Sequence, residues 1–403
     1  MQLSLMSPSF LGLSVATALL LAILRDVTRQ LAFLAANVIF IWSLLLGPNG
    51  AISTIIFCLL GFALTHLIIW RPRWSFPIGL TGFVILFIYM RDYEFLHWAL
   101  PESMLTNILS TVGLSFLFFK IVHVMIEARS STLGSLEFFT YLNYCLNFTT
   151  FMMGPIQRYQ DYFAQWHGQK QAIPLTFEAH LDAVLRILVG LVKAYVLAAL
   201  IEPYTMSPSL NISELPLISL LLSIYAFYLY LYFNFAGYCD VVIGVGSLLG
   251  IRPPENFNKP FLARNISDFW LRMHRSLTLW LTDYVFSPIY KRSLTGSGLT
   301  SHPLVAVNIS LLVTMIVSGL WHGTTLSFLL FGIIHGLYLV VFRTWDMIVI
   351  RRFGKQWVRE YRKKWRVRVS GMFFTFNAVA FAFVFFQLDA SEALHVFTSF
   401  LKL

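Results

Sequence analysis

Residues 304–342 contain two apolar runs, LVAVNISLLVTMIVSGL at 304–320 and LSFLLFGIIHGLYLVVF at 326–342, joined by the short turn WHGTT. Each run is close to the length of about 20 apolar residues that a helix needs to cross the hydrocarbon core of a bilayer. The imidazole of His322 lies in the turn between them. The stretch therefore predicts a pair of membrane-spanning helices with an ionisable side chain where they meet.

The rest of the chain is similarly apolar. Of its 403 residues, 58% are hydrophobic and 12% are charged, whereas soluble domains carry roughly 25% charged residues. Similar apolar runs recur along the chain, and they predict an all-α integral membrane protein with about ten transmembrane helices plus re-entrant or interfacial helices. The predicted spans are Pro8–Leu24, Leu31–Leu46, Ala51–Trp70, Phe76–Met90, Leu105–Ile126, Ala183–Ile201, Leu215–Phe233, Leu304–Leu320, Leu326–Phe342 and Met372–Phe386.

The basic residues predict the orientation of these spans. Lysine and arginine gather in alternate short loops, so Arg71 and Arg73 are expected inside and the acidic stretch Asp92–Glu102 outside, which puts both termini outside. The formal net charge of +10 comes from such loops, so no nucleic-acid partner is expected. The densest basic run, Arg351–Arg368, suits the anionic lipids of the cytoplasmic leaflet, although a plain topology anchor is the simpler interpretation.

Three apolar stretches are interrupted by polar, glycine or proline residues: Leu136–Pro155, Asn234–Gly250 and Leu277–Tyr290. With ten spans, each of them must enter and leave by the same face of the membrane. Irregular backbone at membrane depth persists only where protein or a water-filled cavity satisfies its polar groups. The three stretches are therefore expected to line an internal site within one polytopic domain, residues 1–403.

The turn Gly319–Thr325 contains the first candidate catalytic residue, His322. Ionisable groups inside a membrane are costly and mark functional sites by default. A neutral imidazole such as that of His322 can take a proton from a hydroxyl near neutral pH. The alternative is that His322 and Trp321 form part of an interfacial aromatic belt.

A second candidate constellation comprises Asn256–Phe261 and Asp268–Trp280, where charged, amide and imidazole side chains alternate with aromatic ones. If this segment is helical, Trp270, Met273 and His274 share one face, which could hold a thioester-linked donor. The alternative is an amphipathic interfacial helix whose arginines reach lipid phosphates.

Two polar residues, Asn234 and Asp240, lie in the aromatic stretch YAFYLYLYFNFAGYCD at 225–240. They could orient a histidine or bind a polar acceptor, but a packing and hydrogen-bonding role is the simpler interpretation. His335 is expected to be a hydrogen-bonded packing histidine in mid-span. The sequence has no P-loop, no GxSxG and no HExxH motif, which argues against ATP-driven transport and zinc proteolysis, and no metal site is expected.

Taken together, these motifs resemble the membrane-bound O-acyltransferase family, and within it the bacterial branch that includes alginate O-acetyltransferase and the teichoic-acid D-alanyl transferase. The matching pieces run in the family's order, with a core at about residues 105–345. They are Val112–Phe116, Met153–Tyr159, Tyr232–Asp240, Gly250–Ile251, Asn256–Phe261, Asp268–Trp280, Gly319–Gly323 and His335–Gly336.

The resemblance implies that His322 is the essential intramembrane histidine and His274 a second, more variable functional position. It also implies helices around a central tunnel in the bacterial inner membrane, where a cytoplasmic acyl thioester meets an acceptor from outside. The two histidines are then expected toward opposite mouths of that tunnel. Met273 stands where polysaccharide-acetylating relatives usually have Trp, and Ser287–Lys291 stands where they have a Pro-Leu-Gly-Gly turn, so D-alanyl transfer remains an alternative to the favoured acetyl transfer.

We therefore expect no tightly bound cofactor, and an acyl thioester, acetyl-CoA or an acyl carrier protein, as co-substrate. The acceptor is expected to be a hydroxyl of an envelope polysaccharide or teichoic acid, with envelope proteins as partners. A lipid or polymer transporter and a non-catalytic assembly scaffold are the alternatives from other classes. The side chains expected to bind substrate are Asn258, Lys259, Asp268, Trp270, Arg272, Trp321, Asn234 and Asp240.

Overall fold

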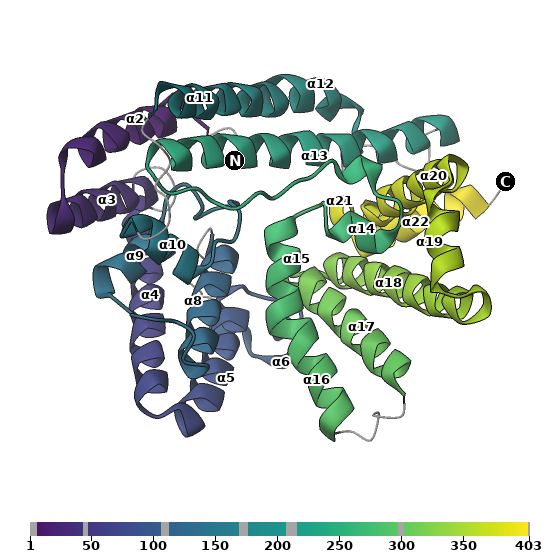
Figure 1. The fold of residues 1–403 in the computed structure, drawn as a ribbon, viewed down its shortest axis with the longest axis horizontal. Helices are drawn as coiled ribbons and strands as arrows, with labels where there is room; N and C mark the ends of the chain where they lie inside the picture. The colour runs from purple at the N-terminus through teal and green to yellow at the C-terminus, as the bar shows by residue number, and fades with distance from the viewer. Residues whose placement is uncertain are drawn as a thin grey trace. The chain divides into compact units, whose positions relative to one another are not determined.

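The computed structural model describes residues 6–42, 47–105, 113–168, 176–206, 216–296 and 302–401, and every regular element in these ranges is a helix (Figure 1). The predicted all-α class is confirmed. Parts of the predicted spans Leu31–Leu46 and Leu105–Ile126, and part of the loop Glu202–Glu214, lie outside the described residues.

Seven of the ten predicted spans coincide with helices that are long and apolar enough to cross a membrane. These are α4 (Gly47–Trp70), α5 (Pro72–Met90), α11 (Phe177–Leu191) with its continuation to Tyr204, α13 (Leu217–Leu248), α17 (Pro303–His322), α18 (Leu326–Phe353) and α20 (Trp365–Ala382) with α21 (Val384–Gln387). The other three predicted spans are also helical, over 15 or 16 described residues. They are α2 (Pro8–Ile23), α3 (Asp26–Phe40) and α8 (Leu114–Arg129).

Shorter helices connect and flank the long ones. In chain order they are α6 (Leu96–Ala99), α7 (Glu102–Leu105), α9 (Phe138–Leu146), α10 (Tyr159–Trp166), η2 (Val192–Ala198), α12 (Ala199–Ile201), η3 (Glu202–Tyr204), η5 (Pro260–Leu262), α14 (Ile266–Trp270), α15 (Arg275–Leu281), η6 (Thr282–Phe286), α16 (Ser287–Gly296), α19 (Lys355–Lys363) and α22 (Ala390–Leu401).

The chain folds into two compact units. The first comprises residues 1–194 and 235–255, and in it α4, α5 and α8 pack side by side (Figure 1). The buried ammonium of Lys120 donates to the carbonyl of Tyr144 over 3.0 Å and to the hydroxyl of Thr150 over 2.9 Å. The predicted irregular stretch Leu136–Pro155 is thus confirmed as broken after α9, with its freed polar groups satisfied by protein.

The prediction of a break in Asn234–Gly250 is wrong, because α13 runs without interruption from Leu217 to Leu248. Its glycines serve close packing against α11 within the first unit. A Cβ added at Gly237 would lie 2.7 Å from the carbonyl oxygen of Gly190, so only a small residue permits this approach. The predicted interruption of Leu277–Tyr290 is also wrong, since η6 is a π-helical turn inside a continuous helix from Arg275 to Gly296.

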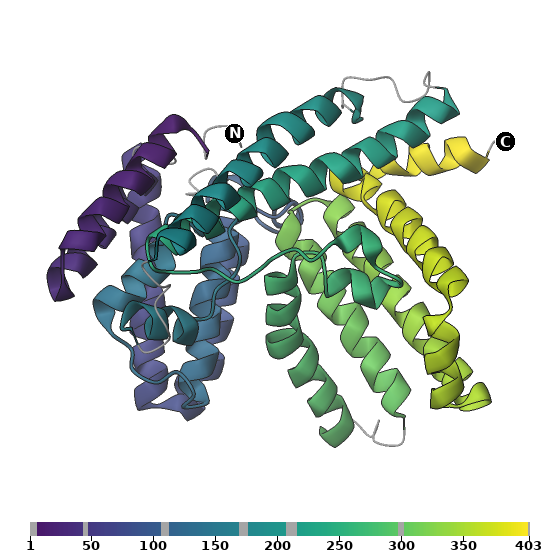
Figure 2. The same ribbon diagram turned by 45° about the horizontal axis from the view of Figure 1, so that its top comes forward.

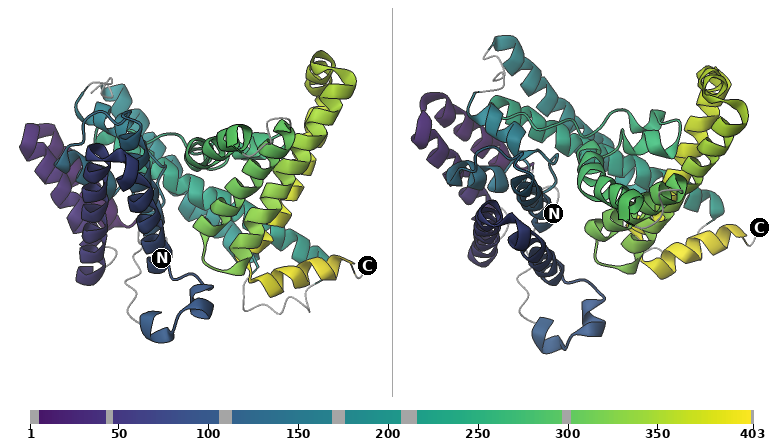
Figure 3. Two further views of the ribbon diagram at one scale, coloured as in Figure 1. Left: turned by 90° about the horizontal axis from the view of Figure 1, so that it is seen from below. Right: turned by 60° about the horizontal axis from the view of Figure 1, so that its bottom comes forward.

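The second unit comprises residues 195–234 and 256–403. The helix formed by α15, η6 and α16 packs against α17, and α17 packs against α18 (Figure 2). Helix α20 runs beside α18 (Figure 3). The core of this unit is aromatic: the ring of Tyr228 lies 5.3 Å from that of Phe383 and 6.5 Å from that of Phe269. The irregular segment 256–274 is held against this core and carries most of the predicted site residues.

Candidate active site

The hairpin of α17 and α18 fixes the position of His322, which is the last residue of α17. The helices approach closely near the turn, because a Cβ added at Gly319 or Gly332 would clash with the backbone of the facing helix. Gly323 caps the end of α17, and its N–H donates to the Gly319 carbonyl over 3.3 Å. The predicted pair of helices with an imidazole at their junction is confirmed.

Aromatic rings surround the His322 imidazole. Its centroid lies 4.7 Å from the ring of Trp321, 5.1 Å from that of Phe386 and 5.8 Å from that of Phe331. The imidazole of His274 lies 6.4 Å away. The two rings, which were expected toward opposite mouths of a tunnel, are therefore neighbours.

His274 is held by a backbone pairing that the sequence did not reveal. The N–H of Asn258 donates to the Arg272 carbonyl, and the N–H of Arg275 donates to the Asn256 carbonyl, both over 2.9 Å. Between these bonds His274 takes a left-handed conformation with φ 46°, immediately before α15. A non-glycine residue in this conformation is uncommon and often belongs to a functional site.

The prediction that Trp270, Met273 and His274 share one helical face is therefore wrong. Helix α14 ends at Trp270, and α15 begins at Arg275. The nonlocal pairing with residues 256–258 interrupts the helix and turns the His274 ring toward Trp321, whose ring centroid is 5.8 Å away.

The amide oxygen of Asn256 determines which nitrogen of His274 carries the proton. This Oδ1 accepts from the backbone N–H of Ser276 over 3.1 Å, which identifies it as the oxygen of the amide. It also accepts from the Ser276 hydroxyl over 2.8 Å and lies 3.2 Å from Nδ1 of His274. Nδ1 must therefore donate, which leaves Nε2 as the acceptor of the neutral ring.

Burial keeps the His274 ring neutral. His274 is only 4% exposed. This burial, together with the neighbouring imidazole of His322, lowers the pKa of His274 well below its ordinary value. Two histidines in contact with one another thus lie in a largely apolar, aromatic setting.

His335 departs from its expected hydrogen-bonded role. It is fully buried, and neither ring nitrogen has a hydrogen-bond partner among the described residues. Its neighbours are aromatic, with the Phe331 ring at 4.5 Å and the Trp270 ring at 5.0 Å.

The charged residues predicted to bind the donor are largely bound to one another. Nε of Arg272 donates to Asp268 over 2.7 Å, and its Nη1 donates to the Asn258 carbonyl over 3.2 Å. Asp268 also accepts from the backbone N–H of Arg264. Asn258 and Lys259 are exposed at the edge of this arrangement.

Asn234 and Asp240 lie on α13. Asn234 donates to the Tyr230 hydroxyl over 3.4 Å. Asp240 belongs to the first unit, where its carboxylate pairs with Lys193 at 2.6 Å and with Arg186 at 3.0 Å. The packing alternative for Asp240 therefore has direct support. Within the described chain, no three His, Cys, Asp or Glu side chains gather closely enough to hold a metal ion.

The model of the membrane-bound O-acyltransferase family matches residues 80–386. The chain belongs to this family. It is therefore an O-acyltransferase and a multi-pass membrane protein, and the transporter and scaffold alternatives are set aside.

Curated relatives within this acyltransferase family act on different envelope polymers. A teichoic acid D-alanyltransferase of Bacillus subtilis is 29% identical over 73% of this chain and 73% of its own length. A probable alginate O-acetylase of Pseudomonas aeruginosa is 30% identical over 61% of this chain and 45% of its own length. A peptidoglycan O-acetyltransferase of Helicobacter pylori is 26% identical over 67% and 48%.

Proposed function

We propose that this acyltransferase moves a short acyl group, acetyl by preference, from a cytoplasmic thioester to a hydroxyl of a cell-envelope polysaccharide. His322 is the general base. The observation that carries the proposal is the pair of imidazoles 6.4 Å apart at the end of α17. The donor is acetyl-CoA or the thioester of an acyl carrier protein, and the chain lies in the bacterial inner membrane with both termini outside.

In the reaction, His322 takes the proton of the acceptor hydroxyl as its oxygen bonds to the thioester carbonyl carbon. The tetrahedral intermediate then collapses, the C–S bond breaks, and the imidazolium returns the proton to the departing thiolate. The products are an ester and a thiol, so atoms and charge balance. General-base catalysis of this kind contributes about 10²- to 10⁴-fold in rate.

His274 acts as a positioning residue in this scheme. Because Asn256 holds the proton on Nδ1, the lone pair on Nε2 favours the imidazolium that forms on His322 during the reaction. The aromatic rings of Trp321, Phe331 and Phe386 border the same space, and their low polarity strengthens this interaction.

The donor approaches through the segment 256–272. Lys259 is exposed there and offers an ammonium group to the phosphates of a donor. The pair of Arg272 with Asp268 keeps the segment in place. We assign Asn258 and Trp270 to the same entrance.

D-alanyl transfer is the second candidate. It is favoured by the teichoic acid D-alanyltransferase of Bacillus subtilis, which matches over nearly three quarters of both chains, whereas the alginate relative matches over less than half of its own length. Acetyl is preferred because the alginate and peptidoglycan relatives are an O-acetylase and an O-acetyltransferase by name.

The test compares His322→Ala with His302→Ala, a control at the opposite, exposed end of α17. Each variant replaces the chromosomal gene, and mild base releases ester-linked acyl groups from envelope polymers for mass spectrometry. We expect His322→Ala to abolish the released esters while the protein remains folded in the membrane, and His302→Ala to retain them. Normal ester levels in His322→Ala cells would refute the proposed base.

A further inference from the structure

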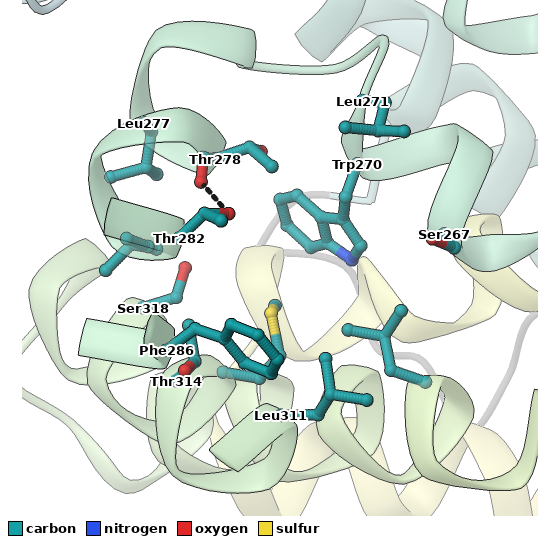
Figure 4. A pocket seen from close by; sticks show the side chains of 13 residues that line it. Ser267, Trp270, Leu271, Leu277, Thr278, Thr282, Phe286, Leu311, Thr314 and Ser318 are labelled. Atoms are coloured by element: carbon teal, nitrogen blue, oxygen red, sulfur yellow. Dashed lines mark hydrogen bonds between the residues drawn. The ribbon is translucent and has the colours of Figure 1, made fainter. Parts of the chain in front are cut away.

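The chemistry of α18 changes along its length. Midway along the helix, Leu339 lines a cavity of about 130 Å³ whose lining residues are all uncharged (Figure 4). At the far end, Arg351 and Arg352 begin a basic segment that continues through α19 and into α20 as far as Arg368. The proposed transfer reaction uses none of these basic side chains, so their role needs a separate account.

Helix α19 joins two helices that are long and apolar enough to cross a membrane, α18 and the helix formed by α20 and α21. It packs against α18 and α20 at the turn between them (Figure 3). Exposed apolar side chains continue along both helices toward this turn, with Ile348 and Phe353 on α18 and Val369 and Phe373 on α20. In a multi-pass membrane protein such exposed apolar surface faces lipid, so α19 lies where two spans meet the membrane surface.

Two contacts fix which face of α19 points toward these spans. Val358 is 4% exposed, and Arg362 pairs with Asp346 of α18. At 3.6 residues per turn, Gln356 and Glu360 lie on the face opposite Val358. The Val358 face of α19 is therefore directed toward the two spans, and the opposite face is directed toward water.

The two edges between these faces carry different side chains. Trp357 and Tyr361 occupy one edge and continue the ring of Phe353, with successive ring centroids 4.6 Å and 4.9 Å apart. Lys355 and Arg359 are one turn apart on the other edge. Exposed tryptophan and tyrosine rings sit at the level of the lipid head groups in a bilayer. The basic edge of the same helix then lies at that level as well.

The basic segment carries more positive charge than the protein balances. Among its nine lysine and arginine residues, Arg362 pairs with Asp346 and Lys363 pairs with Glu360. The other seven, nine less two, are exposed and have no ion-pair partner within the described chain. Their counter-charge therefore comes from outside the described residues.

We propose that the basic edge of α19 binds the head groups of anionic phospholipids. The ammonium of Lys355 and the guanidinium of Arg359 bind phosphate oxygens, while Trp357 and Tyr361 insert between neighbouring head groups. An acidic soluble protein would match the charge, but it would not account for an aromatic edge at the same depth or for a span at each end of the helix. The site does not involve His322 and is independent of the proposed reaction.

The experiment titrates the purified full-length protein with dioleoyl phosphatidylglycerol and, separately, with dioleoyl phosphatidylcholine, and measures bound lipid by native mass spectrometry. The test variant combines Lys355→Gln with Arg359→Gln. The matched control combines Lys291→Gln with Arg292→Gln, which removes the same charge from exposed positions of α16. One basic side chain near an anionic surface strengthens binding about fivefold. We therefore expect the test variant to bind phosphatidylglycerol about 25-fold more weakly, with phosphatidylcholine binding and the control unchanged.

A further variant, Lys355→Arg with Arg359→Lys, keeps both charges and should retain the affinity for phosphatidylglycerol. Its loss of affinity would show that the two positions act through the fold and not through their charge, and would overturn the proposal. Equal affinity for the two lipids, or an equal loss in the test and control variants, would overturn it too. Unchanged binding of phosphatidylglycerol in the test variant would also refute the lipid site and leave the basic edge to an acidic protein.

Discussion

The amide oxygen of Asn256 lies 3.2 Å from Nδ1 of His274, and the same oxygen receives both the backbone N–H and the hydroxyl of Ser276. One uncharged side chain thus fixes the tautomer of a buried histidine and the start of the helix that follows it. The backbone of His274, directly before this helix, is left-handed.

This relationship can be tested by changing the charge of Asn256. In Asn256→Asp a carboxylate still accepts all three bonds, but its charge raises the pKa of His274. We expect transfer to persist, with its acid limb moved to higher pH in a profile of rate against pH. A pH profile identical to that of the wild type would contradict the contact between Asn256 and His274.

The companion substitution is Asn256→Leu. It leaves the buried N–H of Ser276 without its acceptor, which costs about 1–3 kcal/mol. We expect lower thermal stability and loss of transfer together. Unchanged stability would show that the amide oxygen does not hold the start of α15.

The buried His274 should make stability depend on pH. Its pKa is lowered in the folded protein, whereas the unfolded chain titrates near a pKa of about 6.5. Above that pH the ring is neutral in both states, so His274 adds no pH dependence to the free energy of unfolding. Below that pH the unfolded chain binds a proton that the folded protein does not, so the free energy of unfolding falls as the pH falls. In His274→Gln, thermal unfolding between pH 5 and 7 should vary less steeply than in the wild type. Equal dependence of unfolding temperature on pH in the two proteins would refute the lowered pKa of His274.

The close approach of α17 and α18 should tolerate no added side chain. A Cβ at Gly332 would meet the backbone of α17, so Gly332→Ala is expected to displace the helix that carries His322 and to lower both stability and transfer. Gly82→Ala in α5 is the control, since nothing lies within 4 Å of a Cβ there. It should be neutral or stabilising by up to about 1 kcal/mol. Full activity in Gly332→Ala would contradict this packing argument.

Asp240 should affect transfer through the stability of the fold and not through substrate binding. Its carboxylate is shared by Lys193 and Arg186. Asp240→Asn removes the carboxylate that pairs with Lys193, whereas Arg186 keeps its ion pair with Glu255. We expect the unfolding temperature and the amount of ester to fall together. A loss of transfer at wild-type stability would instead restore the predicted substrate-binding role.

Much of the fold could be predicted because hydrophobic length is a local signal. The turn at His322 and seven long spans follow from apolar runs alone. The glycines within α13 led to the wrong prediction of a break in the helix. Gly237 permits close packing against Gly190 and does not interrupt α13. Periodicity cannot distinguish these two uses of a small residue.

The candidate site was less predictable because its key contacts join residues distant in sequence. Asn256 stood in a recognised motif, yet its bond to His274 spans 18 positions and ends a helix that local propensity favours. The hydroxyls of Thr278 and Ser318 have no hydrogen-bond partner among the described residues. They left no sequence signal, because a hydroxyl inside an apolar helix usually bonds to its own backbone.

The uninterrupted length of α13 has a consequence for the surrounding lipid. A helix of 32 residues extends about 48 Å at the usual rise per residue, well beyond a hydrocarbon core of about 30 Å. Such a helix must tilt or emerge from the bilayer. The transferase should therefore respond to membrane thickness, and its rate in nanodiscs should vary with the acyl-chain length of the phospholipids.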